Sequence, residues 1–143
     1  MSKTLRIGGG GGFWGDTEHG AVQLVERGDI DVLIMDYLAE ITMSLLARAR
    51  ARRPEAGYVP DFIEALAPVL HDIKARGIRV ISNAGGMNPP AAAKALRERA
   101  DAMGVDLRIA VVTGDDLMPS IEALRERGAV SYTHLTLPTI LRV

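Results

Sequence analysis

The chain has 143 residues, of which 48% are apolar and 24% are charged, so its length and composition are those of one globular domain. Seventeen Lys and Arg against eighteen Asp and Glu leave a formal net charge of -1, which excludes the basic surface that a nucleic-acid-binding protein needs. Cysteine is absent, which excludes disulfides and thiolate metal ligands. No apolar run is long enough to span a bilayer. We therefore expect a cytoplasmic protein with no nucleic-acid and no membrane partner.

The first half of the chain alternates short apolar runs with amphipathic stretches, a pattern typical of strands that alternate with helices. Residues 4–8 and the nearly continuous apolar run 31–37 predict two buried parallel strands. The helix predicted between them ends at Gly28. Apolar residues at helical spacing over 38–49 predict a second helix with one apolar face, which Pro54 ends.

The next segment is predicted to be a helix that a proline interrupts. Asp61 and Glu64 have the spacing of a capping box at its start. Pro68 should kink this helix, because its ring removes an amide donor and clashes with the preceding turn. Gly77 ends the helix, and residues 78–82 predict the third strand.

Three further elements complete the predicted order. Asn88 followed by Pro89 is typical of the start of a helix. Residues 107–112 predict a fourth strand, and the apolar residues around Ile121 predict a last helix. We therefore expect an α/β fold: a three-layer, Rossmann-like open parallel sheet of four strands with helices on both faces.

The residues after Ala129 break this pattern. Residues 130–143 contain no acidic residue, and their first ten, VSYTHLTLPT, resemble one translated reading frame of a common transposase sequencing adapter. We therefore expect residues 1–129 to form the domain and residues 130–143 to be non-native, encoded by adapter codons. A genuine C-terminal strand is the alternative, because Thr, Tyr, Leu and Ile favour strands.

Ligands of open parallel sheets bind beyond the carboxyl ends of the strands, where the loops converge and helix N-termini favour anionic or polar groups. The loops predicted at this edge contain glycine runs, the single Trp, Asn residues and several carboxylates. We expect Asp16, Asp36 and Asn83 to be catalytic, the carboxylates as base or metal ligand and the amide as a polar contact. The residues expected to bind the ligand are Gly10, Gly12, Trp14, Gly15, Glu40, Gly85, Gly86 and Asn88.

Several of these residues have an alternative explanation. Gly10, Gly12 and Gly15, with Asp36 about twenty residues on, match the G-x-G-x-x-G fingerprint of dinucleotide-binding proteins, but a glycine run also suits a tight turn.

Other candidate residues near these loops also have a simple structural explanation. Asp115 and Asp116 suit metal ligation or simple capping of the last helix. His19 is a candidate base, but it has no spaced partner. These residues identify neither a metal nor a cofactor.

Five segments together resemble the acyclic terpene utilisation A (AtuA-like) family. They are GFWGD (12–16), LVERGDIDVLIMDYLAEITMSLLARARA (24–51), GYVPDF (57–62), LAPVL (66–70) and SNAGGMNP (82–89). The resemblance covers most of residues 4–129. Proteins of that family are longer than this chain, so we expect residues 1–129 to be the N-terminal part of a larger protein.

The resemblance implies a role in acyl-CoA-linked catabolism of acyclic terpenes such as citronellol and geraniol. We expect a small-molecule enzyme or enzyme component of unknown reaction, with an acyl or terpenoid substrate. One alternative is a non-catalytic ligand-binding or assembly subunit of an acyl-CoA-processing complex. The expected protein partner is an acyl-CoA-processing protein or further copies of this chain. Another alternative is an oxidoreductase that binds a nicotinamide dinucleotide.

Overall fold

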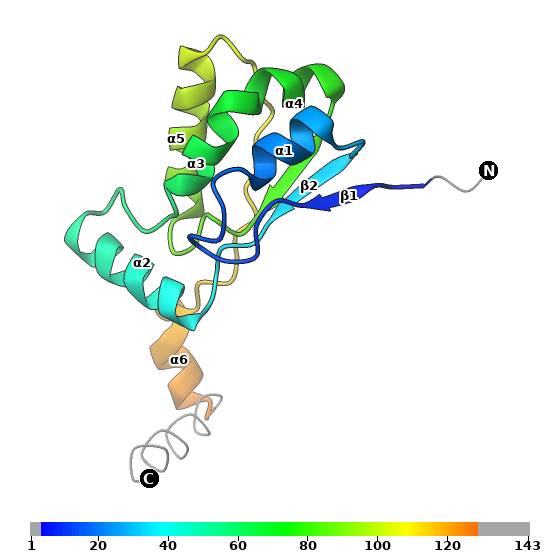
Figure 1. Ribbon diagram of the computed structural model, residues 1–143. Coiled ribbons are helices and arrows are strands. Elements are labelled where there is room, and N and C mark those ends of the chain that lie inside the picture. The colour runs from blue at the N-terminus through cyan, green and yellow to red at the C-terminus, as the bar shows by residue number, and fades with distance from the viewer. Residues whose placement is uncertain (1–3, 129–143) are drawn as a thin grey trace. The chain divides into compact units, whose positions relative to one another are not determined.

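The computed structural model describes residues 4–128. The chain divides into two units, one ending at Val112 and the other beginning at Thr113 (Figure 1). The segment 130–143, predicted to be non-native, lies outside the described residues.

The first unit contains a three-stranded parallel sheet. Its strands are β1 (Ile7–Gly9), β2 (Val32–Met35) and β3 (Arg79–Ser82), and β2 lies between the other two. The register pairs Gly9 with Ile34 and Ile34 with Ile81. The predicted α/β class and three of the predicted strands are therefore confirmed.

The helices follow the predicted order. They are α1 (Gly20–Arg27), α2 (Glu40–Arg52), α3 (Asp61–Leu66), α4 (Leu70–Arg76) and α5 (Pro89–Ala102) in the first unit, and α6 (Ile121–Glu126) in the second. The predicted break at Pro68 is a short 3-10 turn, Ala67–Val69, between α3 and α4. Gly77 ends α4 in the left-handed conformation, with φ of 66°, which glycine adopts without steric cost. None of the described helices has the length and apolar character needed to cross a bilayer.

The predicted capping box at Asp61 is wrong. Pro60 occupies the N-cap position of α3, and no side chain caps this end of the helix. Asp61 is instead the first residue of α3, so its carboxylate is available for another contact.

The apolar face predicted for α2 is only partly buried, because Leu46 is 2% exposed whereas Ile41 is 71% exposed.

The fourth strand predicted at 107–112 is not formed in the described chain. Exposure alternates from Val105 to Ala110 as it would in a strand, but the segment pairs with no other strand. The carbonyl of Leu107, which would accept from a neighbouring strand in a sheet, accepts instead from the guanidinium of Arg97. Val112, at the end of the segment, is 90% exposed, so no burial compensates for the missing pairing.

Helices cover only one face of this sheet, so the predicted three layers are also wrong for the described residues. Leu33 and Met35 point to the covered face and are at most 1% exposed. There they pack with residues of α1, α3, α4 and α5 in the hydrophobic core. Ile7 and Ile81 point to the other face, because side chains alternate along a strand, and are 57% and 58% exposed.

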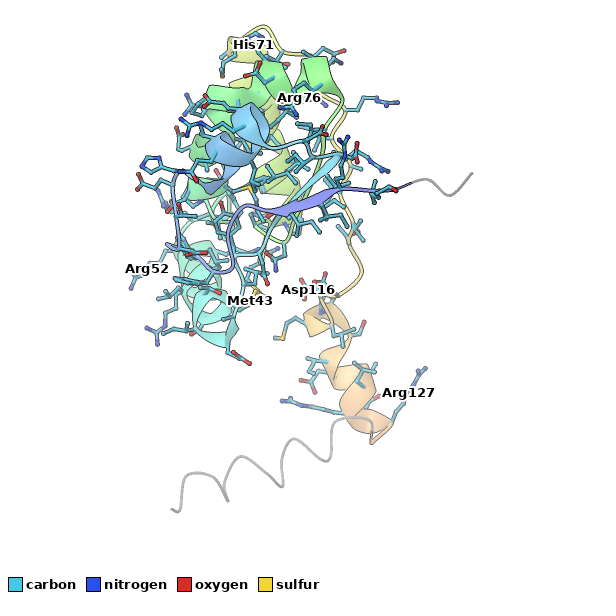
Figure 2. All side chains as sticks on the ribbon, turned by 45° about the vertical axis from the view of Figure 1, so that its right-hand side comes forward. Met43, Arg52, His71, Arg76, Asp116 and Arg127 are labelled. Atoms are coloured by element: carbon cyan, nitrogen blue, oxygen red, sulfur yellow. The ribbon has the colours of Figure 1, made fainter. Side chains whose placement is uncertain are left out.

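Arg76 at the end of α4 joins two helices that are distant in sequence. Its guanidinium donates to the carbonyl of Val25 near the end of α1 and, at 2.7 Å, to the carbonyl of Gly28 (Figure 2). The last carbonyls of a helix have no partner within the helix, so a cationic donor there also interacts favourably with the helix dipole.

Replacing Arg76 with alanine should lower the free energy of unfolding by about 1–2 kcal/mol, because two carbonyls lose a charged donor. Chemical denaturation of the full chain measures this change. Lys74→Ala is the matched control, since Lys74 is exposed on the same helix. An equal loss in both variants would contradict the assigned role of Arg76.

Candidate functional site

The loops that follow the three strands meet at the carboxyl edge of the sheet. Asp36 directly follows β2, and Asn83 directly follows β3. The amide Nδ2 of Asn83 donates to Oδ1 of Asp36 at 2.6 Å, and its Oδ1 accepts from the backbone N–H of Tyr37 at 2.8 Å. The backbone N–H of Asp36 donates to the carbonyl of Gly11 at 3.0 Å. Segments from all three strand ends are thus in direct contact.

The two carboxylate oxygens of Asp36 have different surroundings. Oδ1 accepts from Asn83 and, at 3.3 Å, from the backbone N–H of Leu38. For Oδ2, no donor is found among residues 4–128. Asp36 is exposed, so the structure orients this carboxylate through one oxygen and leaves the other open to solvent. A carboxylate held in this way can accept a hydrogen bond or a proton from a ligand.

Asp16, the other predicted catalytic carboxylate, closes its own loop. Its Oδ2 accepts from the backbone N–H of Gly12 at 2.9 Å, and its backbone N–H donates to the carbonyl of Phe13 at 3.1 Å. Gly15 in the same turn has φ of 92°, a conformation that favours glycine. Asp16 therefore has a local structural role, and among residues 4–128 its carboxylate makes no hydrogen bond with Asp36 or Asn83.

Trp14 extends from this turn to a helix that sequence reasoning did not connect with it. Its indole Nε1 donates to Oδ2 of Asp61 at 3.0 Å, and its ring packs on the edge of the core. The two residues are separated by 47 positions. The one available signal was the single Trp itself, because a partly buried indole N–H needs an acceptor that the nearby sequence does not supply.

The glycine run has two different environments. A Cβ added at Gly10 would lie 2.9 Å from Leu33, and one at Gly20, the first residue of α1, would lie 2.3 Å from the carbonyl of Gly10. Gly20 therefore has to lack a side chain because the backbone of Gly10 lies against it, whereas at Gly10 the close neighbour is the Leu33 side chain. At Gly9 and Gly11 an added Cβ would meet nothing within 4 Å, so packing does not require glycine there.

This geometry differs from a dinucleotide fingerprint. In that motif the third glycine allows close packing of the first helical turn on the strand. Here Gly15 precedes the first residue of α1, Gly20, by five positions, and the close contact is made by Gly10 and Gly20. The sequence predicts a start of this helix near Thr17, but the helix begins at Gly20.

Asn88 and the glycines before it serve the fold. Asn88 caps α5, accepting from the N–H of Ala91 at 3.4 Å, and its Nδ2 donates to the carbonyls of Pro54 and Ala56, each at 2.9 Å. A Cβ at Gly85 would lie 2.9 Å from Pro89, and one at Gly86 would lie 2.4 Å from Leu46. Because the side chain of Asn88 already makes hydrogen bonds through its Nδ2 and its Oδ1, it does not offer a ligand an open polar atom as the carboxylate of Asp36 does.

The N-terminus of α5 does not offer the amides that we expected it to offer to an anion. Its first two residues, Pro89 and Pro90, have no backbone N–H. The next two amides donate to Asn88, that of Ala91 to the side chain and that of Ala92 to the carbonyl. Because these four positions supply the free donors of a helix N-terminus, none remains here for a ligand.

The remaining candidates lie apart or have local roles. Glu40 is the first residue of α2 and is exposed. In the second unit, Asp116 accepts from the N–H of Met118 at 3.1 Å, but Ser120 is the N-cap of α6 and no side chain caps this helix, so the predicted capping by Asp115 or Asp116 is wrong. Among residues 4–128 no three His, Asp or Glu side chains are grouped so that they could hold a metal ion.

A cavity of about 300 Å³ lies elsewhere, between α3 and α5. Its walls include Tyr58, Ile63 and the ion pair of Glu64 with Arg99. It contains none of the residues that the sequence predicts to be catalytic or ligand-binding.

Tyr37 lies beneath the site. It is 6% exposed, and its ring packs edge-on against Phe62 with 6.0 Å between the ring centroids. Burial, and secondly the negative charge of Asp61, raises the pKa of Tyr37 to about 12. Both causes disfavour the tyrosinate, so the folded protein keeps this phenol neutral where an exposed one ionises.

Stability should fall as the pH rises from 10 to about 12, because the unfolded chain ionises this phenol near pH 10 while the folded chain keeps it neutral. Below pH 10 the contribution of Tyr37 is fully present. The measurement is the free energy of unfolding against pH, and Tyr37→Phe should flatten that part of the curve. A Tyr58→Phe variant that flattened it equally would show that the assignment to Tyr37 is wrong.

Comparison with known protein families identifies a match. The model of the family described as acyclic terpene utilisation family protein AtuA matches residues 5–140. No curated protein and no solved structure matches the chain.

Proposed function

Because the chain belongs to the acyclic terpene utilisation (AtuA) family, we propose that it is an enzyme, or a component of one, that binds an acyclic terpenoid or its acyl derivative at the Asp36–Asn83 site. Asp36 is the acceptor or general base for the polar end of the ligand, and Asn83 positions it. The observation that carries this proposal is the asymmetry of the carboxylate, with Oδ1 held by Asn83 at 2.6 Å and Oδ2 open.

The chemistry of the surrounding surface suits a ligand with one polar end and an apolar chain. Ile34 and Ile81 are register partners on the open face, and they lie two residues before Asp36 and Asn83, which directly follow β2 and β3. Ile34 is 38% exposed and Ile81 is 58% exposed. The polar pair therefore lies just beyond the strand ends that carry these exposed apolar side chains. Burial of part of a hydrocarbon chain on such a surface is favourable.

Asp36→Asn should weaken the binding of citronellol about tenfold, because the open carboxylate oxygen is the acceptor for the hydroxyl group. If Asp36 is also the general base, the variant should lose about 10²–10⁴-fold in turnover and fail to support growth on citronellol in a bacterium whose own AtuA-family gene is deleted. Calorimetry on the full chain measures binding. Asp101→Asn is the matched control, since Asp101 is an exposed carboxylate on α5. Unchanged binding and growth for Asp36→Asn would contradict the proposal.

Ile81→Ser should weaken citronellol binding and leave the weaker binding of 3-methylbutan-1-ol unchanged, because the short alcohol has the polar end but little chain to bury. Ile41→Ser, on the exposed side of α2, is the control for removing an exposed isoleucine. Equal losses for both alcohols would mean that the open face does not contact the chain of the ligand.

A second candidate, a non-catalytic assembly subunit, is favoured by α2. Besides Ile41, this helix exposes Leu45, which is 50% exposed, and continues into exposed arginines such as Arg52 (Figure 2). An apolar patch beside positive charges suits a protein partner. An assembly subunit would lose partner binding in an Ile41→Lys variant and would keep its function in Asp36→Asn.

A further inference from the structure

We propose that Asp61 is a positioning residue of the candidate site. Through Trp14 it holds the turn of residues 12–16, called the glycine turn below, at the carboxyl end of the sheet. The proposal rests on the proposed function, because it concerns the same site, and it gives a role to a carboxylate that its own helix does not use.

The glycine turn is closed by bonds within itself. The carboxylate of Asp16 accepts from the backbone N–H of Gly12 at 2.9 Å, and the carbonyl of Phe13 accepts from the backbone N–H of Asp16 at 3.1 Å. These bonds set the shape of the turn. They do not attach it to the body of the domain.

Attachment of the glycine turn depends on Trp14. Its bond to Asp61, at 3.0 Å, is the only hydrogen bond found between residues 12–16 and a described residue outside the turn. Trp14 is also half-buried against the core, whereas the rest of the turn is exposed. Without the Asp61 acceptor, the indole N–H would lose its partner, and the turn would keep only the packing of one ring.

The position of this turn matters for Asp36. Gly11, immediately before the turn, accepts from the backbone N–H of Asp36 at 3.0 Å. The residue that leads into the turn is therefore joined to the backbone of the proposed base, and the Trp side chain of the turn is joined to α3. A displaced turn would change the surroundings of Asp36 without removing any group that contacts a ligand, which is the property of a positioning residue.

Asp61 is not needed for the start of α3. Pro60 is the N-cap, and no side chain caps the helix. A carboxylate in the first turn interacts favourably with the helix dipole, but a contribution of that kind is small and does not require the indole. The hydrogen bond to Trp14 is thus the specific contact that this side chain makes.

The test compares variants that remove the acceptor with one that keeps it. Asp61→Ala removes it, whereas Asp61→Asn keeps an oxygen acceptor and removes the charge. Trp14→Phe removes the donor and keeps an aromatic ring. Asp72→Ala, at an exposed carboxylate in the first turn of α4, is the matched control. Citronellol is the probe, calorimetry on the full chain gives its dissociation constant, and the emission of Trp14, the only Trp, reports on the turn.

We expect Asp61→Ala to weaken citronellol binding about tenfold and to shift the Trp14 emission to the red, because the indole becomes more exposed. Asp61→Asn and Asp72→Ala should behave as the unaltered chain. Trp14→Phe should weaken binding as Asp61→Ala does, and the double variant should bind no more weakly than either single variant, because both remove one interaction. Trp14→Phe and Asp61→Asn test the proposal even if Asp61→Ala fails to fold.

Two results would overturn the proposal. The first is unchanged citronellol binding in both Asp61→Ala and Trp14→Phe. The second is binding in Asp61→Asn as weak as in Asp61→Ala with an unshifted emission, because Asp61 would then act by its charge and not through Trp14. If Asp36→Asn still weakens binding in either case, the proposed function stands and only the role of Asp61 is wrong. Failure of the unaltered chain to bind citronellol, or unchanged binding in Asp36→Asn, contradicts the proposed function itself.

Discussion

Parallel pairing of β2 with both of its neighbours is the constraint on which the rest of the first unit depends. Because β1, β2 and β3 run in the same direction, the segments that follow them emerge at one edge of the sheet. Asp36 and Asn83 are 47 positions apart in sequence and are nevertheless hydrogen-bonded there. The same pairing makes Leu33 and Met35 the centre of the core, since they face the helices from the middle strand.

Two asparagines from one loop illustrate how identical side chains acquire different roles. The amide of Asn83 bridges the ends of two strands, and its acceptor is a carboxylate that still has an open oxygen. The side-chain amide of Asn88 caps the start of α5 and donates to two carbonyls of the loop after α2. Asn88 can therefore be assigned to the stability of the fold, and Asn83 to the orientation of Asp36. The double proline that follows Asn88 also removes the amides that make other helix N-termini attractive to anions.

The open face of the sheet connects the fold with the proposed ligand. An exposed isoleucine on the middle strand of a sheet, such as Ile34, is unusual for a three-layer α/β domain, in which helices bury both faces. In the described residues the helices lie on one face only, so an apolar surface leads directly to the polar Asp36–Asn83 pair. This juxtaposition is compatible with the proposed ligand, which has one polar end and an apolar chain. The glycine turn lies beside the same pair, and its attachment through Trp14 and Asp61 links the site to α3.

The sequence by itself determined the α/β class, the order of the elements and several of their ends. Apolar periodicity identified the three paired strands and the helices between them, and Pro68 and Gly77 acted as predicted because their backbone restrictions are local. The family, too, follows from long blocks of sequence. Pairing, burial and side-chain partners are not local, so only the tertiary structure decided them. Residues 107–112 have the alternation of a strand but find no partner, Ile41 has helical spacing but no surface to cover it, and Asp61 has the spacing of a cap but bonds to Trp14. In each case the local pattern specifies which conformation or contact a residue can adopt, and the energy that selects one of them comes from a residue many positions away.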